Sequence, residues 1–141
     1  MSSLKYGTGN DPYCYKDTDI LINQLNIKDA AILEQAETEI SDISSASIDF
    51  APPPYNFSYL QNIHQILFGD LYDWAGQSRT IGMNKGDTMF CRPEYIQREI
   101  DKLFKTLTKA NYFQNIPVTT LIIKIAELYG DLNIIHPFRE G

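Results

Sequence analysis

Apolar residues recur at intervals of three and four along most of the chain, and this spacing constrains the fold more than any other feature. In the segment 57–74 they occupy positions 60, 63, 67, 71 and 74. Comparable spacing runs through 28–48, 93–109 and 118–135. A period near 3.6 residues places such side chains along one stripe of an α-helix. The sequence therefore predicts a mainly α fold with four helical regions.

Local residues indicate where these helices begin and which of them is buried. Asn26 is a candidate N-cap for the first helix. Pro93 and Pro117 stand at the starts of the last two, where a missing backbone N–H costs little. Gly69 divides the second region into two pieces if it ends a helix there. The helix over 118–135 is apolar almost all round, so we expect it to be central and buried. The stripe predicted for the first helix holds Leu33, Ala36, Ile40 and Ile43.

One segment interrupts the helical pattern. Residues 79–91 read RTIGMNKGDTMFC, with the turn formers Asn84, Gly86 and Asp87 between two short runs of strand-forming residues. This arrangement predicts a short β-hairpin, or flap. An isolated hairpin is only marginally stable, so we expect the flap to pack against the helices. The length of 141 residues fits a single domain over 1–141.

Charge and composition exclude several classes of function. The net charge is -6, the isoelectric point is about 4.8, and no run of Lys or Arg occurs. Binding to nucleic acid or to a membrane surface would require basic patches, so neither is expected. No apolar run is long enough to cross a bilayer. The N-terminus carries no recognisable secretion signal, so we expect Cys14 and Cys91 to be free thiols in a reducing cytoplasm.

Six special-purpose residues, HPFREG, follow the apolar helix at positions 136–141. Histidine in general titrates near neutral pH, so His136 has the chemistry of a general base. Glu140 has the carboxylate that Mg²⁺ accepts beside a phosphate. Phe138 is a large apolar anchor, and Gly141 allows a positive φ or close approach of a ligand. Proline and glycine also end ordinary helices, so a simple helix terminus stays open as the alternative.

Four stretches of the sequence resemble the Fic domain family. HPFREG resembles the first six positions of the family signature H-P-F-x-[D/E]-G-N-[G/K]-R. IHQILFGDLYDWAGQSRT, residues 63–80, resembles the upstream block of histidine, Leu-Phe, Tyr-x-Trp-Ala-Gly and arginine. MNKGDTMF (83–90) resembles the family's flap, and GTGNDPYCY (7–15) resembles the start of short bacterial Fic proteins of the cell filamentation type. The order and spacing also agree, over nearly the whole chain.

This resemblance implies a Fic-type helical domain that acts as a protein adenylyltransferase. Such an enzyme transfers AMP from ATP to a Tyr, Thr or Ser hydroxyl of a target protein and releases pyrophosphate. The resemblance implies that His136 is the base, that Glu140 holds Mg²⁺, and that Pro137 and Phe138 anchor the motif. It further implies nucleotide-binding roles for Gly141, Lys85 and Gly86. The flap residues that hold the target in extended form would be Met83, Asn84, Asp87 and Thr88.

The family signature extends beyond the position that Gly141 occupies. Its Asn, second Gly and arginine would follow Gly141 and begin a helix whose amides and arginine bind phosphates. We therefore expect that a polypeptide ending at Gly141 does not transfer AMP. We also expect that, without the C-terminal helices, apolar surface is uncovered on the helix over 118–135.

Regulation and function each leave alternatives open. Many Fic enzymes are inhibited by a helix that bears [S/T]-x-x-x-E-[G/N], and no glutamate from Glu34 to Glu140 fits this pattern. We expect inhibition, if it operates, from a more C-terminal helix or from a separate antitoxin chain. A non-catalytic Fic-like binding module, and transfer of another phosphate-containing group, stay open as alternatives to AMP transfer.

Overall fold

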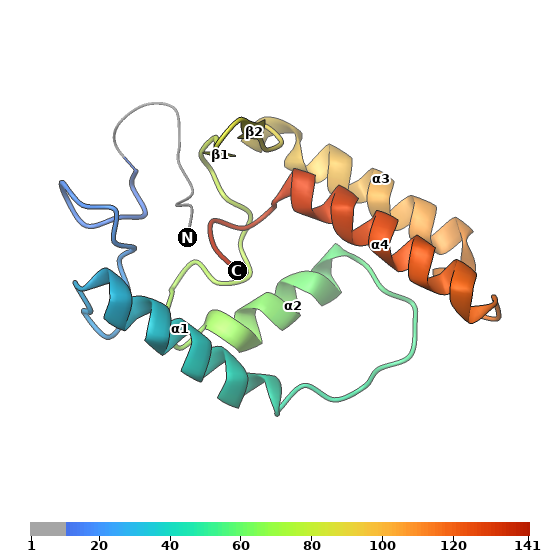
Figure 1. Ribbon diagram of the computed structural model, residues 1–141, viewed down its shortest axis with the longest axis horizontal. Helices are drawn as coiled ribbons and strands as arrows, with labels where there is room; N and C mark the ends of the chain where they lie inside the picture. The colour runs from blue at the N-terminus through green and yellow to red at the C-terminus, as the bar shows by residue number, and fades with distance from the viewer. Residues whose placement is uncertain (1–10) are drawn as a thin grey trace. The chain divides into compact units, whose positions relative to one another are not determined.

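The structure, a computed structural model, describes residues 11–141 (Figure 1). The described residues form two compact units. The flap unit comprises Pro52–Phe57 and Ser78–Pro137, and the α1 unit comprises residues 11–51, Ser58–Gln77 and Phe138–Gly141. Residues 7–10, in the stretch that resembles the start of short bacterial Fic proteins, lie outside the described residues.

The first helix of the α1 unit, α1, spans Ala30–Ser45. Its N-cap is Asp29, whose side chain accepts a hydrogen bond from the backbone N–H of Ile32 at 3.1 Å. The prediction that Asn26 caps this helix was wrong. Asn26 has a left-handed φ of 53° and lies in a turn, where its N–H donates to the carbonyl of Asn23. An N-cap needs an extended backbone, which Asn26 lacks and Asp29 has, so Asp29 caps the helix.

The second helix, α2, spans Phe57–Phe68 and is shorter than the predicted 57–74. The carbonyl of Phe68 accepts hydrogen bonds from the N–H groups of both Leu71 and Tyr72, at 3.0 and 2.9 Å. These two bonds close a turn and end the helix near Gly69, as one reading of the sequence allowed. Leu71 and Tyr72, which follow this point, therefore enter the core from a turn and not from a continuous helix.

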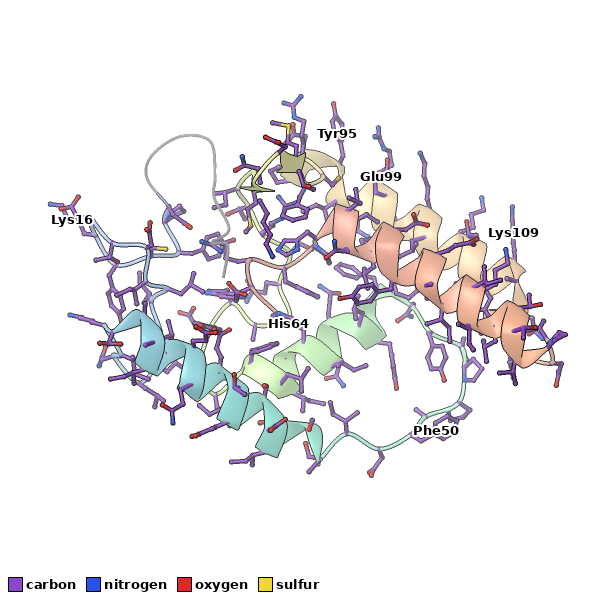
Figure 2. All side chains as sticks on the ribbon, viewed as in Figure 1. Lys16, Phe50, His64, Tyr95, Glu99 and Lys109 are labelled. Carbon is purple, nitrogen blue, oxygen red and sulfur yellow. The ribbon has the colours of Figure 1, made fainter. Side chains whose placement is uncertain are left out.

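The core of the α1 unit is small and draws on distant parts of the chain. Its buried members are Cys14, Leu21, Leu33, Leu71 and Tyr72. The stripe predicted along α1 is only partly buried, since the side chain of Ile43 is 76% exposed. Leu33 belongs to this core and Ile40 packs against it, whereas Ile43 is not among the residues that do so. Phe50, in the segment that joins α1 to α2, is also exposed (Figure 2).

The flap unit contains a pair of helices that lie side by side (Figure 1). A 3₁₀ turn, η1 (Pro93–Tyr95), leads into α3 (Ile96–Lys109). A second 3₁₀ turn, η2 (Asn111–Phe113), precedes α4 (Val118–Ile135). The apolar spacing predicted over 93–109 is confirmed, because Ile96, Ile100 and Leu107 are buried and Leu103 is half-buried.

The helix α4 has the predicted bounds, but the prediction that it is buried was wrong. Ile135 is its one buried residue, and Val118, Ile122 and Tyr129 are 70%, 62% and 71% exposed. Ile123, Ile125 and Ile134 of the same helix are exposed as well. Apolar character on all sides predicts burial only where every side has a neighbour. Within residues 11–141, none of the helices combines the length and apolar character needed to cross a bilayer.

The predicted hairpin is present in the flap unit. Its strands are β1 (Asn84–Lys85) and β2 (Thr88–Met89), which pair antiparallel with Lys85 opposite Thr88. Gly86 and Asp87 form the two-residue turn between them. Gly86 has a φ of +59°, which favours glycine at the first position of such a turn. Over residues 11–141, the mainly α fold with one short hairpin is therefore confirmed.

Candidate active site

The boundary between the two units falls within HPFREG. His136 and Pro137 belong to the flap unit, and Phe138–Gly141 belongs to the α1 unit. The contacts of the motif therefore form two sets, one in each unit.

His136 is the C-cap of α4 and has a left-handed backbone, with φ 47° and ψ 67°. Its N–H donates to the carbonyl of Leu132 at 2.9 Å, which closes the last turn of the helix. The imidazole stacks on the ring of Phe90, with ring centres 4.4 Å apart and planes 15° apart. Left-handed backbone costs a non-glycine residue roughly 1–2 kcal/mol. His136 therefore ends a helix and also has an imposed backbone and ring orientation.

Arg79 donates several hydrogen bonds to the backbone at and near His136, and its side chain is 2% exposed. Its Nε donates to the carbonyl of His136 at 2.6 Å, and Nη2 donates to that of Ile135 at 3.1 Å. Nη1 donates to the carbonyl of Ile81, and Nη2 also donates to that of Cys91. This arginine is part of the upstream block that resembles the family, but its sequence context indicated no individual role for it.

The predicted flap residues divide into a buried base and an exposed tip. Met83 is buried, and its carbonyl accepts from the N–H of Phe90 at 3.1 Å, while Asn84 is half-buried. The tip residues Lys85, Gly86, Asp87 and Thr88 are all exposed. The structure thus brings the base of the flap together with the ring stacked on His136, and it leaves the tip open to solvent.

Phe138 is buried in the α1 unit and stacks on the ring of His64, with centres 3.9 Å apart. Nδ1 of His64 accepts from the N–H of Gly76 at 2.9 Å, so the ring proton lies on Nε2. Nε2 then donates to the carbonyl of Glu140 at 2.7 Å. Burial lowers the pKa of His64, which favours this neutral form. His64 is therefore a packed core histidine that also holds the motif backbone.

Arg139 occupies the variable position of the signature and forms a buried ion pair. Its Nε donates to Oδ2 of Asp11 at 3.0 Å, and its Nη2 bonds the same oxygen. The two side chains are 5% and 0% exposed. A paired charge is stable at such depth, whereas either charge alone would not be. No motif in the sequence indicated this pair.

Gly141 has a φ of +92° and lies against the ring of Phe68. A Cβ at this position would lie 2.5 Å from Cε2 of that ring, so only glycine fits here. Its N–H donates to Oε1 of Glu140 at 3.4 Å. The positive φ expected for Gly141 is therefore present, with an aromatic ring as its neighbour.

Glu37 of α1 is a further acidic group, which no sequence pattern indicated. Burial, followed by the charge of Glu140, raises its pKa from 4.5 to about 7. The hydroxyl of Tyr72 acts in the opposite direction and lowers that pKa. The carboxylate of Glu140 therefore repels a second acid in the α1 unit.

We expect Glu37→Gln to stabilise the protein at alkaline pH. Because the folded-state pKa of Glu37 is raised, the folded state favours its protonated form, and this stability is lost as pH rises from 4.5 through about 7. Glutamine resembles the protonated acid and avoids this loss. The full shift corresponds to about 3 kcal/mol, and screening by solvent reduces the expected gain at pH 8 to about 1–2 kcal/mol.

The free energy of unfolding in urea, measured at pH 5 and pH 8 in the presence of a chelator, tests this expectation. The gain should appear at pH 8 and nearly vanish at pH 5. Glu39→Gln, an exposed position on the same helix, is the matched control. An equal gain at both pH values would contradict the raised pKa.

The carboxylate of Glu140 suits a metal ion that is already bound to a phosphate group. Within residues 11–141 no group of three or more His, Cys, Asp or Glu side chains is arranged to hold a metal ion. Glu140 offers one half-buried carboxylate at the end of the motif. Mg²⁺ is commonly bound by one or two carboxylates, with water and substrate phosphates as the other ligands. Glu140 therefore fits Mg²⁺ carried by a nucleotide.

The Fic/DOC family model matches residues 54–141 of this chain. The chain is 37% identical over 139 residues to the probable protein adenylyltransferase Fic of Escherichia coli K12, covering 99% of this chain and 70% of that protein. The chain belongs to the Fic/DOC family.

Solved structures agree with this assignment. The BepC protein of Bartonella tribocorum with bound AMPPNP has a TM-score of 0.82 at 28% identity, covering 92% of this chain and 70% of that one. The N-terminal Fic domain of an effector protein from Bartonella sp. AR 15-3 has the same TM-score at 26% identity. The match covers 92% of this chain and 65% of that domain structure.

Proposed function

We propose that the protein carrying this chain is a protein adenylyltransferase that transfers AMP from ATP to a hydroxyl group of a target protein. The observation that carries the proposal is the arrangement at the end of α4. There His136 has an imposed left-handed backbone and a ring stacked on Phe90, at the base of an exposed hairpin. Its family relatives include proteins named adenylyltransferases and a structure with a bound ATP analogue.

His136 acts as the general base in this proposal. The target's hydroxyl oxygen attacks the α-phosphorus of ATP, and its proton passes to the imidazole of His136. The bond between the α-phosphorus and the oxygen bridging to the β-phosphorus breaks, and pyrophosphate leaves with that electron pair. Stacking on Phe90 restricts the ring, which favours one direction of proton transfer.

Glu140 is the residue that would hold Mg²⁺ on the phosphates. When bound, the metal supplies charge stabilisation for the phosphate oxygens. The chain itself fixes the backbone next to this carboxylate, because His64 donates to the carbonyl of Glu140 and Gly141 packs against Phe68. These two contacts hold the backbone of residues 140–141, from which the carboxylate extends.

The flap tip would bind the target by main-chain pairing. The two strands are short and the residues Lys85–Thr88 are exposed, which leaves backbone donors and acceptors for an extended peptide. Lys85 and Gly86 would also approach the nucleotide. We further propose that an inhibitory segment, on this protein or on a separate antitoxin chain, controls the activity.

Labelled ATP tests the proposed function. The protein is incubated with a lysate and Mg²⁺, in parallel reactions with ATP labelled at the α-phosphate or at the γ-phosphate. We expect protein-bound label from the α-phosphate alone and a mass increase that corresponds to AMP. Label from the γ-phosphate would instead indicate phosphoryl transfer. If neither form of ATP gave protein-bound label, but the protein still bound a target protein from the lysate, the result would favour the non-catalytic binding module.

A further inference from the structure

Arg79 joins three separate segments of the flap unit through main-chain hydrogen bonds. Its guanidinium donates to Ile81 at the start of the flap, to Cys91 at its end, and to Ile135 and His136 at the end of α4. Its own N–H donates to the carbonyl of Pro137 at 2.8 Å. Three consecutive carbonyls, those of residues 135–137, are therefore bonded to this one residue.

The guanidinium of Arg79 bonds the end of a helix. The last carbonyls of an α-helix have no partner within the helix and carry its partial negative charge. Ile135 is the last residue of α4, and its carbonyl accepts from Nη2 of Arg79. The N–H of Cys91 donates to the preceding carbonyl, that of Ile134, at 3.1 Å. The end of α4 is thus bonded both by Arg79 and by the end of the flap.

These bonds account for the backbone conformation of His136. A left-handed non-glycine residue persists only where its surroundings impose that conformation. The bonds to the carbonyls of His136 and Pro137 fix the peptide planes on the C-terminal side of the left-handed residue. Because the same side chain also bonds Ile81 and Cys91, the flap base and the His136 backbone are set together.

We propose that Arg79 is a positioning residue, which holds the backbone of His136 and both ends of the flap in one fixed arrangement. This proposal rests on the proposed function, since it assigns Arg79 the task of aligning the base with the hydroxyl that the flap presents. Arg79 does not touch the reacting atoms and acts through the groups it orients. The four side-chain bonds come from the three nitrogens of a planar fork, whereas lysine offers three donors on a single nitrogen.

The variant Arg79→Lys in the protein that carries this chain tests the proposal, with Arg98→Lys, at an exposed side chain of α3, as the matched control. Lysine keeps the charge but lacks the planar guanidinium. The imidazole of His136 should therefore be misaligned, while ATP binding is largely retained. We expect kcat for AMP transfer to fall about 10–100-fold, with the KM for ATP changed by less than about twofold. A normal kcat, or a loss confined to KM, would overturn the proposal.

Hydrogen exchange provides a second readout that does not depend on transfer. In Arg79→Lys, amides in residues 80–92 and 133–140 should exchange faster, while those of α3 should not change. Equal acceleration in α3 would show a general role in stability and would overturn the proposal. If wild-type protein transfers no AMP, the proposed function fails, and the exchange pattern still tests whether Arg79 joins flap and motif.

A measurement on the wild-type protein covers the case in which Arg79→Lys does not fold. The Nε–H of Arg79 bonds the carbonyl of His136 in a buried position, so its NMR signal should be protected from exchange with water. The Nε–H of exposed Arg98 is the internal reference. Exchange of Arg79 as fast as that of Arg98 would overturn the proposal.

Discussion

Replacing His136 with alanine should reduce AMP transfer by about 10²–10⁴-fold, the usual effect of removing a general base. The imidazole acts on the hydroxyl proton in the transition state, so its loss should lower kcat far more than it weakens ATP binding. The left-handed backbone at position 136 is held by bonds from Arg79, and these do not involve the imidazole. The variant should therefore fold, with loss of the contact to Phe90.

Labelling with ATP that carries the label on the α-phosphate measures the rate, and calorimetry measures ATP binding in parallel. Lys109→Ala, at the exposed end of α3, serves as the control for substitution itself (Figure 2). Near-normal labelling by His136→Ala would exclude the base role. Loss of ATP binding to the same extent as loss of rate would point instead to a role in holding the nucleotide.

The parts of the fold that depend on nearby residues could be predicted from the sequence. The buried face of α3 follows from its spacing, and the hairpin turn follows from Gly86 between strand-forming residues. The burial of α4 could not be predicted in this way. Periodicity describes which residues share a side of a helix, but exposure depends on which neighbours cover that side. Val118 and Tyr129 are apolar and exposed for this reason.

In the candidate site too, local sequence patterns predict some residues and miss those that depend on distant contacts. HPFREG is a local pattern, and its resemblance to a family made His136 and Glu140 candidates directly. The residues that hold the motif lie far from it in sequence: Arg79 is 57 residues from His136, and Asp11 is 128 residues from Arg139. A lone arginine or aspartate has no pattern that specifies a distant partner. Such pairs are visible only once the chain is folded.

Glu140→Gln should lower the rate of AMP transfer strongly and weaken its dependence on Mg²⁺. Glutamine keeps the shape of the side chain but removes the charge, and a hard cation prefers an ionised oxygen ligand. The bond from His64 reaches the backbone carbonyl of Glu140, so the substitution leaves it in place. The loss should therefore reflect metal binding, with the motif still folded.

A titration of the transfer rate with Mg²⁺, at saturating ATP, measures this effect. The half-maximal Mg²⁺ concentration should rise about tenfold or more in the variant, which corresponds to a loss of about 1.4 kcal/mol of metal binding. Glu127→Gln, on the exposed side of α4, is the matched control and should give the wild-type curve. A variant curve that superimposes on the wild-type curve would exclude Glu140 as a ligand, because the only change between the two proteins is the charge that the cation would contact.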